Sequence, residues 1–122
     1  MPIFDIEYVR AAASRTAIPS VQTLADALGR TLAAKPGRVW VRMRLLDRSG
    51  YAENAVPLAD EALPVFVRVL LAQPPVGDAL AAQAAALADC VARCFARRID
   101  LVHLEYAAPG AGRVAFGGKL VE

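Results

Sequence analysis

The sequence predicts an α/β (α+β) fold in which a duplicated βαβ unit forms one four-stranded sheet with two helices on one face. Three observations support this prediction. In each half of the chain, residues 1–62 and 63–122, the apolar pattern changes from a period of two to a helical period and back. The length of 122 residues suffices for one hydrophobic core, so we expect a single domain over residues 1–122.

The third observation is an internal repeat. The segment that begins at Pro2 (Pro-Ile-Phe) matches the segment that begins at Pro64 (Pro-Val-Phe) at an offset of 62 residues. The segment Leu-Ala-Asp occurs at Leu24 and again at Leu87, at an offset of 63 residues. We therefore expect parallel strand pairing inside each half, with a right-handed crossover through the helix.

The first half begins with a predicted strand over residues 2–9, in which apolar and acidic residues alternate. Residues 10–18 are interpreted as a connection. Ser20 is placed to cap a helix that ends near residues 35–37, because leucines recur at helical spacing in between. A second strand is predicted over residues 38–46. Its two faces carry Val39, Val41, Met43 and Leu45 on one side and Arg38, Trp40, Arg42 and Arg44 on the other.

The second half repeats this order. A strand is predicted over residues 64–71, and the breakers at residues 73–77 end it. Asp78 is expected to cap a helix that ends near residues 97–98. The last main strand is predicted over residues 99–106, with His103 and Glu105 on the face opposite Val102 and Leu104. Residues 114–121 are typical of a short terminal strand or hairpin.

Composition excludes a disordered chain and predicts subunit contacts, because 57% of the residues are hydrophobic and 21% are charged. No run approaches the roughly 18 apolar residues of a membrane helix. The first residues lack a basic stretch followed by an apolar core, so we expect a cytoplasmic protein with no membrane partner. Two helices can cover only one face of the sheet, and the other face is expected to bind further copies of the chain.

Charged residues favour a small anionic ligand over nucleic acid. Twelve of the fourteen cations are arginines, and four of them, at positions 38, 42, 44 and 48, fall within eleven residues. The guanidinium group binds carboxylates and phosphates through a planar fork of donors. A net charge of +2 is small for a surface that follows a phosphate backbone.

Metal and redox chemistry are not expected. Cys90 and Cys94 lie four residues apart in a helical pattern, and His103 is the only histidine. A metal site would need more ligands than these, so we interpret the cysteines as small buried thiols in a reducing compartment. No catalytic triad, phosphate-binding loop or cofactor motif occurs.

A duplicated βαβ chain that begins Met-Pro resembles the tautomerase superfamily, and most closely its 5-carboxymethyl-2-hydroxymuconate isomerase type. The resemblance rests on the first strand from Pro2, on residues 38–44 and 51–54, on residues 66–69, and on the terminal Phe-Gly-Gly at Phe116. It implies a cofactor-free homotrimer with three pockets at subunit edges. The implied reaction moves a proton within a small unsaturated carboxylate, such as a carboxymethyl-hydroxymuconate.

In this family the catalytic base is a proline that becomes the amino terminus when methionine is removed, which implies that role for Pro2. An α-amino group has an ordinary pKa of about 7.7 to 8.0, and apolar surroundings lower it because the charged form loses hydration. Pro2 would then be a general base near neutral pH. The alternative is an ordinary proline at the start of a strand, as Pro64 must be.

The resemblance also implies substrate-binding residues. Trp40 stands nearest to the position of an arginine in the short tautomerases, so the carboxylate-binding role passes to Arg42, with Arg44 as the second choice. Tyr51 is expected to hydrogen-bond an enolate oxygen, and Arg68 to reach the pocket. The alternatives are solvated or ion-paired arginines at an interface and a tyrosine that packs a turn; His103 fits an interface residue better than a base.

Two other functions stay open at this stage. A decarboxylase or dehalogenase of the same superfamily would use the same proline. A non-enzymatic binding or assembly module with a ferredoxin-like βαββαβ order would have the same sequence of elements.

Overall fold

The computed structural model describes residues 2–11 and 18–122. Met1 and residues 12–17, which make up most of the expected connection after the first strand, lie outside the described residues. The main elements follow the predicted order: β1 Ile3–Arg10, α1 Val21–Thr31, β2 Trp40–Asp47, β3 Val65–Leu70, α2 Gly77–Phe95, β4 Val102–Tyr106, β5 Ala115–Phe116 and β6 Lys119–Leu120.

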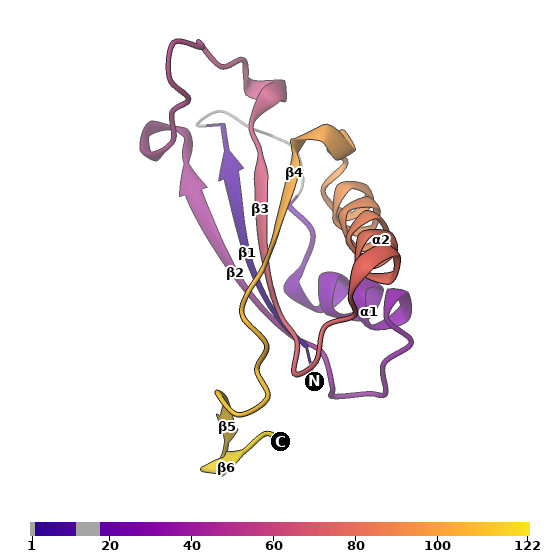
Figure 1. The fold of residues 1–122 in the computed structure, drawn as a ribbon. Coiled ribbons are helices and arrows are strands. Elements are labelled where there is room, and N and C mark those ends of the chain that lie inside the picture. Colours follow the sequence, from indigo (N-terminus) through magenta and orange to yellow (C-terminus); the bar gives the residue numbers. More distant parts are fainter. Residues whose placement is uncertain (1, 12–17) are drawn as a thin grey trace.

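The sheet has the strand order β2-β1-β3-β4, and both helices lie on one of its faces (Figure 1). Strands β1 and β2 are parallel, β3 and β4 are parallel, and the two halves meet through the antiparallel pair β1–β3. The duplicated βαβ architecture is confirmed. Because the parallel strands of each half are direct neighbours, the sheet lacks the split βαβ of a ferredoxin-like fold, and that topology is wrong for this chain.

The internal repeat is confirmed in the strand spacing and wrong in one detail. Ile3 pairs with Trp40 and Val65 pairs with Val102, so the parallel partner lies 37 residues further along in both halves. Phe4 is fully buried toward the helices, whereas Phe66 lies on the open face of the sheet. Side chains alternate between faces along a strand, so the two strands correspond at an odd offset and not at 62 residues.

The hydrophobic core lies between the sheet and the helices. Its largest members are fully buried, and the rings of Tyr8 and Phe95 stack with centroids 4.9 Å apart. Arg97 lies over the Tyr8 ring and donates to the Tyr8 hydroxyl at 2.8 Å and to the Leu63 carbonyl. Arg97 thereby ties the end of α2 to the far end of β1.

Two helix ends differ from the predicted ones. Ser20 caps α1 as expected, and its Oγ accepts the Thr23 N–H at 3.0 Å. Asp78 does not cap α2: the cap is Val76, because Gly77 has a positive φ of 59° and starts the helix one residue earlier. Ala96 ends α2 in a left-handed conformation, and a 3₁₀ turn over Ile99–Leu101 delays β4.

Leu45 was expected to share the buried face of its strand, but 44% of it is exposed. It lies at the end of β2 farthest from α1 in Figure 1, where no helix covers the edge of the sheet. In the described part of the chain, no helix is both long enough and apolar enough to span a membrane.

Candidate active site

The open face of the sheet presents its side chains in rows, because neighbouring strands pair in register. The row nearest to Pro2 is apolar and consists of Trp40, Ile3 and Leu70. The second row is charged and runs across all four strands as Arg42, Asp5, Arg68 and Glu105. The third row is mixed and consists of Arg44, Glu7, Phe66 and His103.

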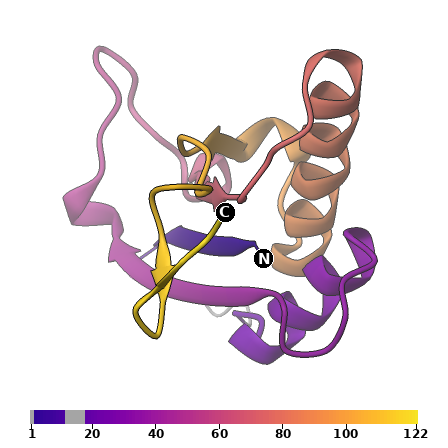
Figure 2. The same cartoon turned by 60° about the horizontal axis from the view of Figure 1, so that its bottom comes forward.

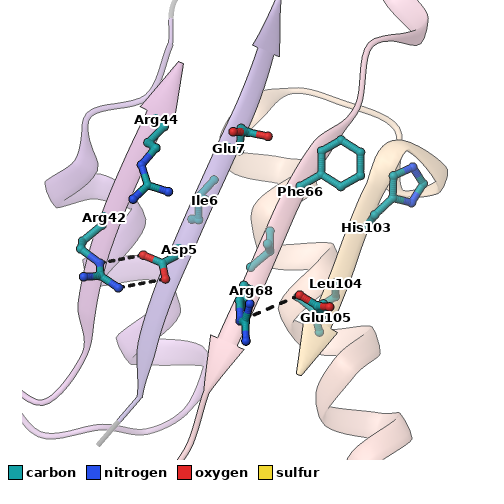
Figure 3. A pocket seen from close by; sticks show the side chains of 11 residues that line it. Asp5, Ile6, Glu7, Arg42, Arg44, Phe66, Arg68, His103, Leu104 and Glu105 are labelled. Carbon is teal, nitrogen blue, oxygen red and sulfur yellow. Dashed lines mark hydrogen bonds and ion pairs between the residues drawn. The ribbon is translucent and has the colours of Figure 1, made fainter. Parts of the chain in front are cut away.

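The charged row is paired internally. Arg42 donates from Nε to Asp5 Oδ1 at 2.7 Å and from Nη2 to Asp5 Oδ2 at 2.9 Å, and Arg68 Nε lies 3.9 Å from Glu105 Oε1 (Figure 3). The hydrogen bonds to Asp5 and its charge raise the pKa of Arg42. A carboxylate ligand at Arg42 must therefore compete with Asp5 for the same fork of donors.

Arg44 differs from its neighbours. It lines the same shallow cavity of about 470 Å³, together with Phe66 and His103, whose rings lie 5.5 Å apart. Among the described residues, no carboxylate forms an ion pair with Arg44, although Glu7 is its partner in the strand register. Of the three predicted arginines of this cavity, Arg44 is the most available to an anion.

Pro2 lies at the opposite end of β1 and does not line that cavity. Its residue is buried, and its carbonyl accepts the Trp40 N–H at 3.1 Å. At about 3.3 Å per residue along the strand, Asp5 is roughly 10 Å further on. Pro2 is therefore next to the apolar row and apart from the arginines.

Tyr51 lies near the other end of the sheet. Its ring packs against Phe66 with centroids 5.7 Å apart, and its hydroxyl donates to Glu53 Oε2 at 2.6 Å. This hydrogen bond, together with burial, raises the pKa of Tyr51 to about 12. Tyr51 belongs to an apolar cluster with Val9, and seven residues of strand, roughly 23 Å, separate Val9 from Pro2.

The structure thus brings Arg42, Arg44, Arg68 and His103 together on one face. It does not bring Pro2 or Tyr51 into the same cavity of one chain. Their catalytic and binding roles stay predictions. Arg48, the last arginine of the sequence cluster, forms an ion pair with Asp60 and donates to the Leu58 carbonyl, which ties together the connection between the two halves.

Sequence analysis missed an aromatic pair at the Pro2 end of the open face. Trp40 is 45% exposed, and its ring meets the Phe116 ring edge to face, with centroids 5.0 Å apart. Phe116 belongs to the hairpin β5–β6, which crosses the start of β2 in Figure 2. Each strand of this hairpin has two residues, too few for a periodic signal, so the sequence predicts the hairpin but not its partner.

Metal-binding geometry is absent from residues 2–11 and 18–122, where no group of three or more His, Cys, Asp and Glu side chains gathers. Cys90 and Cys94 are free thiols and half-buried. Burial, together with the neighbouring Cys90, raises the pKa of Cys94, which disfavours a reactive thiolate.

Comparison with known proteins supports the fold. No model of a known protein family and no curated protein sequence matches the chain. Solved structures match it over almost its whole length. The F6 fused 4-OT asymmetric trimer has a TM-score of 0.73 at 14% identity, covering 97% of this chain and 94% of that chain. Pt0534 inactivated by 2-oxo-3-pentynoate has a TM-score of 0.70 at 13% identity, covering 98% of this chain and 94% of that chain.

A third structure, macrophage migration inhibitory factor from Oncomelania hupensis, has a TM-score of 0.71 at 15% identity, covering 100% of this chain and 83% of that chain. These neighbours are members of the tautomerase superfamily. At such identities the similarity establishes the fold: this chain has a tautomerase-like α+β fold.

Proposed function

We propose that this protein is a cofactor-free tautomerase or isomerase that acts on a small unsaturated carboxylate, with Pro2 as general base. The observation that carries the proposal is the position of Pro2. It lies at the start of the central strand β1 of a tautomerase-like fold, buried at the edge of an open sheet face. Apolar surroundings lower the pKa of an amine and keep it unprotonated near neutral pH.

The reaction needs only proton transfer. The nitrogen lone pair of Pro2, free once Met1 is removed, takes a proton from the substrate and leaves a dienolate. The protonated nitrogen then returns the proton at the other end of the conjugated system, so atoms and charges balance without a cofactor. A nearby cation stabilises the dienolate by attracting the charge that spreads toward its carboxylate.

A 5-carboxymethyl-2-hydroxymuconate-like substrate is the narrower form of this proposal. It would use Arg44, Arg42 or Arg68 for its carboxylates and Tyr51 for the enolate oxygen. Pro2 and Tyr51 lie at opposite ends of one chain's sheet, so a site that contains both requires a neighbouring subunit. We propose a homotrimer, and the trimers among the fused 4-OT structures support it.

The test combines intact mass with activity. Protein that mass spectrometry shows to lack Met1 should ketonise phenylenolpyruvate or a hydroxymuconate, and its rate should fall as pH drops through the pKa of the amine. Pro2→Ala should retain partial activity, because a primary amine replaces the secondary one. One extra residue before Pro2 should abolish activity while the oligomeric state stays unchanged.

Pro64→Ala is the matched control, because Pro64 begins β3 and can never be an amine. It should keep full activity if the protein remains folded. Full activity in protein that retains Met1 would refute the mechanism. In that case the second candidate, a non-enzymatic binding or assembly module, is favoured by the internal pairing of Arg42 and Arg68. A decarboxylase or dehalogenase would instead release carbon dioxide or halide, which product analysis detects.

A further inference from the structure

The apolar row beside Pro2 differs in chemistry from the rest of the open face. Trp40 presents an exposed ring, and Phe116 meets this ring edge to face, so the two form an aromatic shelf. The Trp40 indole is fixed from both sides: its backbone N–H binds the Pro2 carbonyl, and its Nε1–H donates to the Gly37 carbonyl at 3.1 Å. The shelf is therefore a rigid apolar surface in direct contact with the proposed base.

Lys119 supplies a cation at this shelf. In the hairpin, Lys119 is the antiparallel partner of Phe116. Residues directly opposite each other in such a pair point to the same side, which places Lys119 on the side of the hairpin that carries Phe116. Among the described residues, Lys119 forms no ion pair.

The arginines are less suited to a ligand held at the shelf. Arg42 is engaged by Asp5 through two hydrogen bonds. Arg44 is four residues beyond Trp40, which is roughly 13 Å along the strand. A second carboxylate placed on the Trp40 ring would lose hydration without finding a free arginine.

From this arrangement we propose that the shelf binds an aryl monocarboxylate, with its ring on Trp40 and Phe116 and its carboxylate on Lys119. This inference rests on the proposed function and narrows its substrate class from a dicarboxylate of the muconate type to an aryl-substituted unsaturated acid. Trp40 and Lys119 are then the residues that determine specificity. An aromatic ring stacks on the shelf, whereas an extended dicarboxylate finds one cation and an apolar surface.

The binding experiment uses unreactive acids, so it does not depend on the Pro2 lone pair. Trp40 is the only tryptophan in the chain, so its fluorescence reports occupancy of the shelf directly. Titration with 3-phenylpropionate should quench this fluorescence and give an affinity at least about tenfold higher than that for muconate. Equal affinities, or tighter binding of muconate, would overturn the inference.

Variants assign the two contacts, with affinities measured by calorimetry. Trp40→Leu should weaken phenylpropionate binding by about five- to tenfold, and Lys119→Met by about tenfold. Trp40→Arg should reverse the preference toward muconate. Two controls should leave the affinity unchanged: Leu120→Ala, which removes an exposed side chain from the same hairpin, and Arg93→Met, which removes a charge from α2.

Thermal unfolding and the oligomeric state must match the wild type in each variant. Unchanged phenylpropionate affinity in folded Trp40→Leu or Lys119→Met protein would refute the shelf. The proposed function fails separately: protein without Met1 that binds phenylpropionate with the stated preference but has no tautomerase activity keeps the binding site and refutes the catalytic role of Pro2.

Discussion

The two faces of the sheet differ in what holds their side chains in place. On the covered face, Phe4, Ile6 and Val67 are almost completely buried against the helices, and their positions follow from apolar periodicity. On the open face, the side chains between them form rows of paired charges, with an aromatic shelf at one end. The covered face therefore supplies stability, whereas the open face has groups that are free to exchange their partners for a ligand.

The largest expected effect tests the covered face. Leu87 lies on α2 with no exposed surface. Leu87→Ala should lower the free energy of unfolding by about 2 to 5 kcal/mol, because it removes buried methyl groups and leaves a cavity. Urea unfolding measures this loss. Val76→Ala, at a position that is 81% exposed, is the control and should change stability by less than about 0.5 kcal/mol. Similar losses at both positions would contradict the comparison.

A smaller effect tests the exchange of partners on the open face. Asp5→Asn should release Arg42 from its bidentate ion pair and tighten binding of a small dicarboxylate such as muconate several-fold. Stability should change by at most about 1 kcal/mol, because the Arg42 side chain is 67% exposed and surface ion pairs are weak. Isothermal calorimetry measures the affinity. Asp47→Asn, which disrupts the Arg10–Asp47 pair at the far end of the sheet, should leave it unchanged.

Weaker dicarboxylate binding in Asp5→Asn would show that the ion pair orients Arg42 for the ligand and does not block it. Such a result would make the two faces more alike, since both would then depend on fixed side-chain contacts.

The smallest effect concerns Tyr51. Its hydroxyl should titrate near pH 12 in an ultraviolet absorbance titration, and Glu53→Gln should return the pKa toward the ordinary value of about 10. A pKa raised in the folded state favours the protonated hydroxyl. The associated stability is complete below about pH 10 and is lost as pH rises toward 12. Equal pKa values in the wild type and Glu53→Gln would remove the hydrogen bond as the cause.

The sequence predicted the covered face better than the open face, for a physical reason. Burial imposes a period on every residue of a strand or helix, so Val65, Val67 and Val69 identify their face without knowledge of any partner. The Arg42–Asp5 pair and the Trp40–Phe116 contact depend on strand register and on where a hairpin folds back. These are long-range properties that one-dimensional spacing does not encode.

Local chemistry misled the sequence interpretation at two places. The matching prolines and phenylalanines near Pro2 and Pro64 suggested an offset of 62 residues, although the faces of Phe4 and Phe66 require an odd one. Asp78 has the usual chemistry of a helix cap, but the positive φ of Gly77 starts the helix before it. In both cases backbone geometry outweighed residue identity.

The equal strand spacing in the two halves also bears on how the chain folds. Each parallel pair joins residues 37 positions apart, whereas the central pair joins residues as far apart as Ile3 and Leu70. The entropy of closing a loop grows only with the logarithm of its length, at about 0.6 kcal/mol for each doubling. Closure therefore gives the halves almost no head start over the central pair. The order of assembly is decided by which apolar contacts form first, and Tyr8 on Phe95 joins the two halves at the outset of any collapse that includes them.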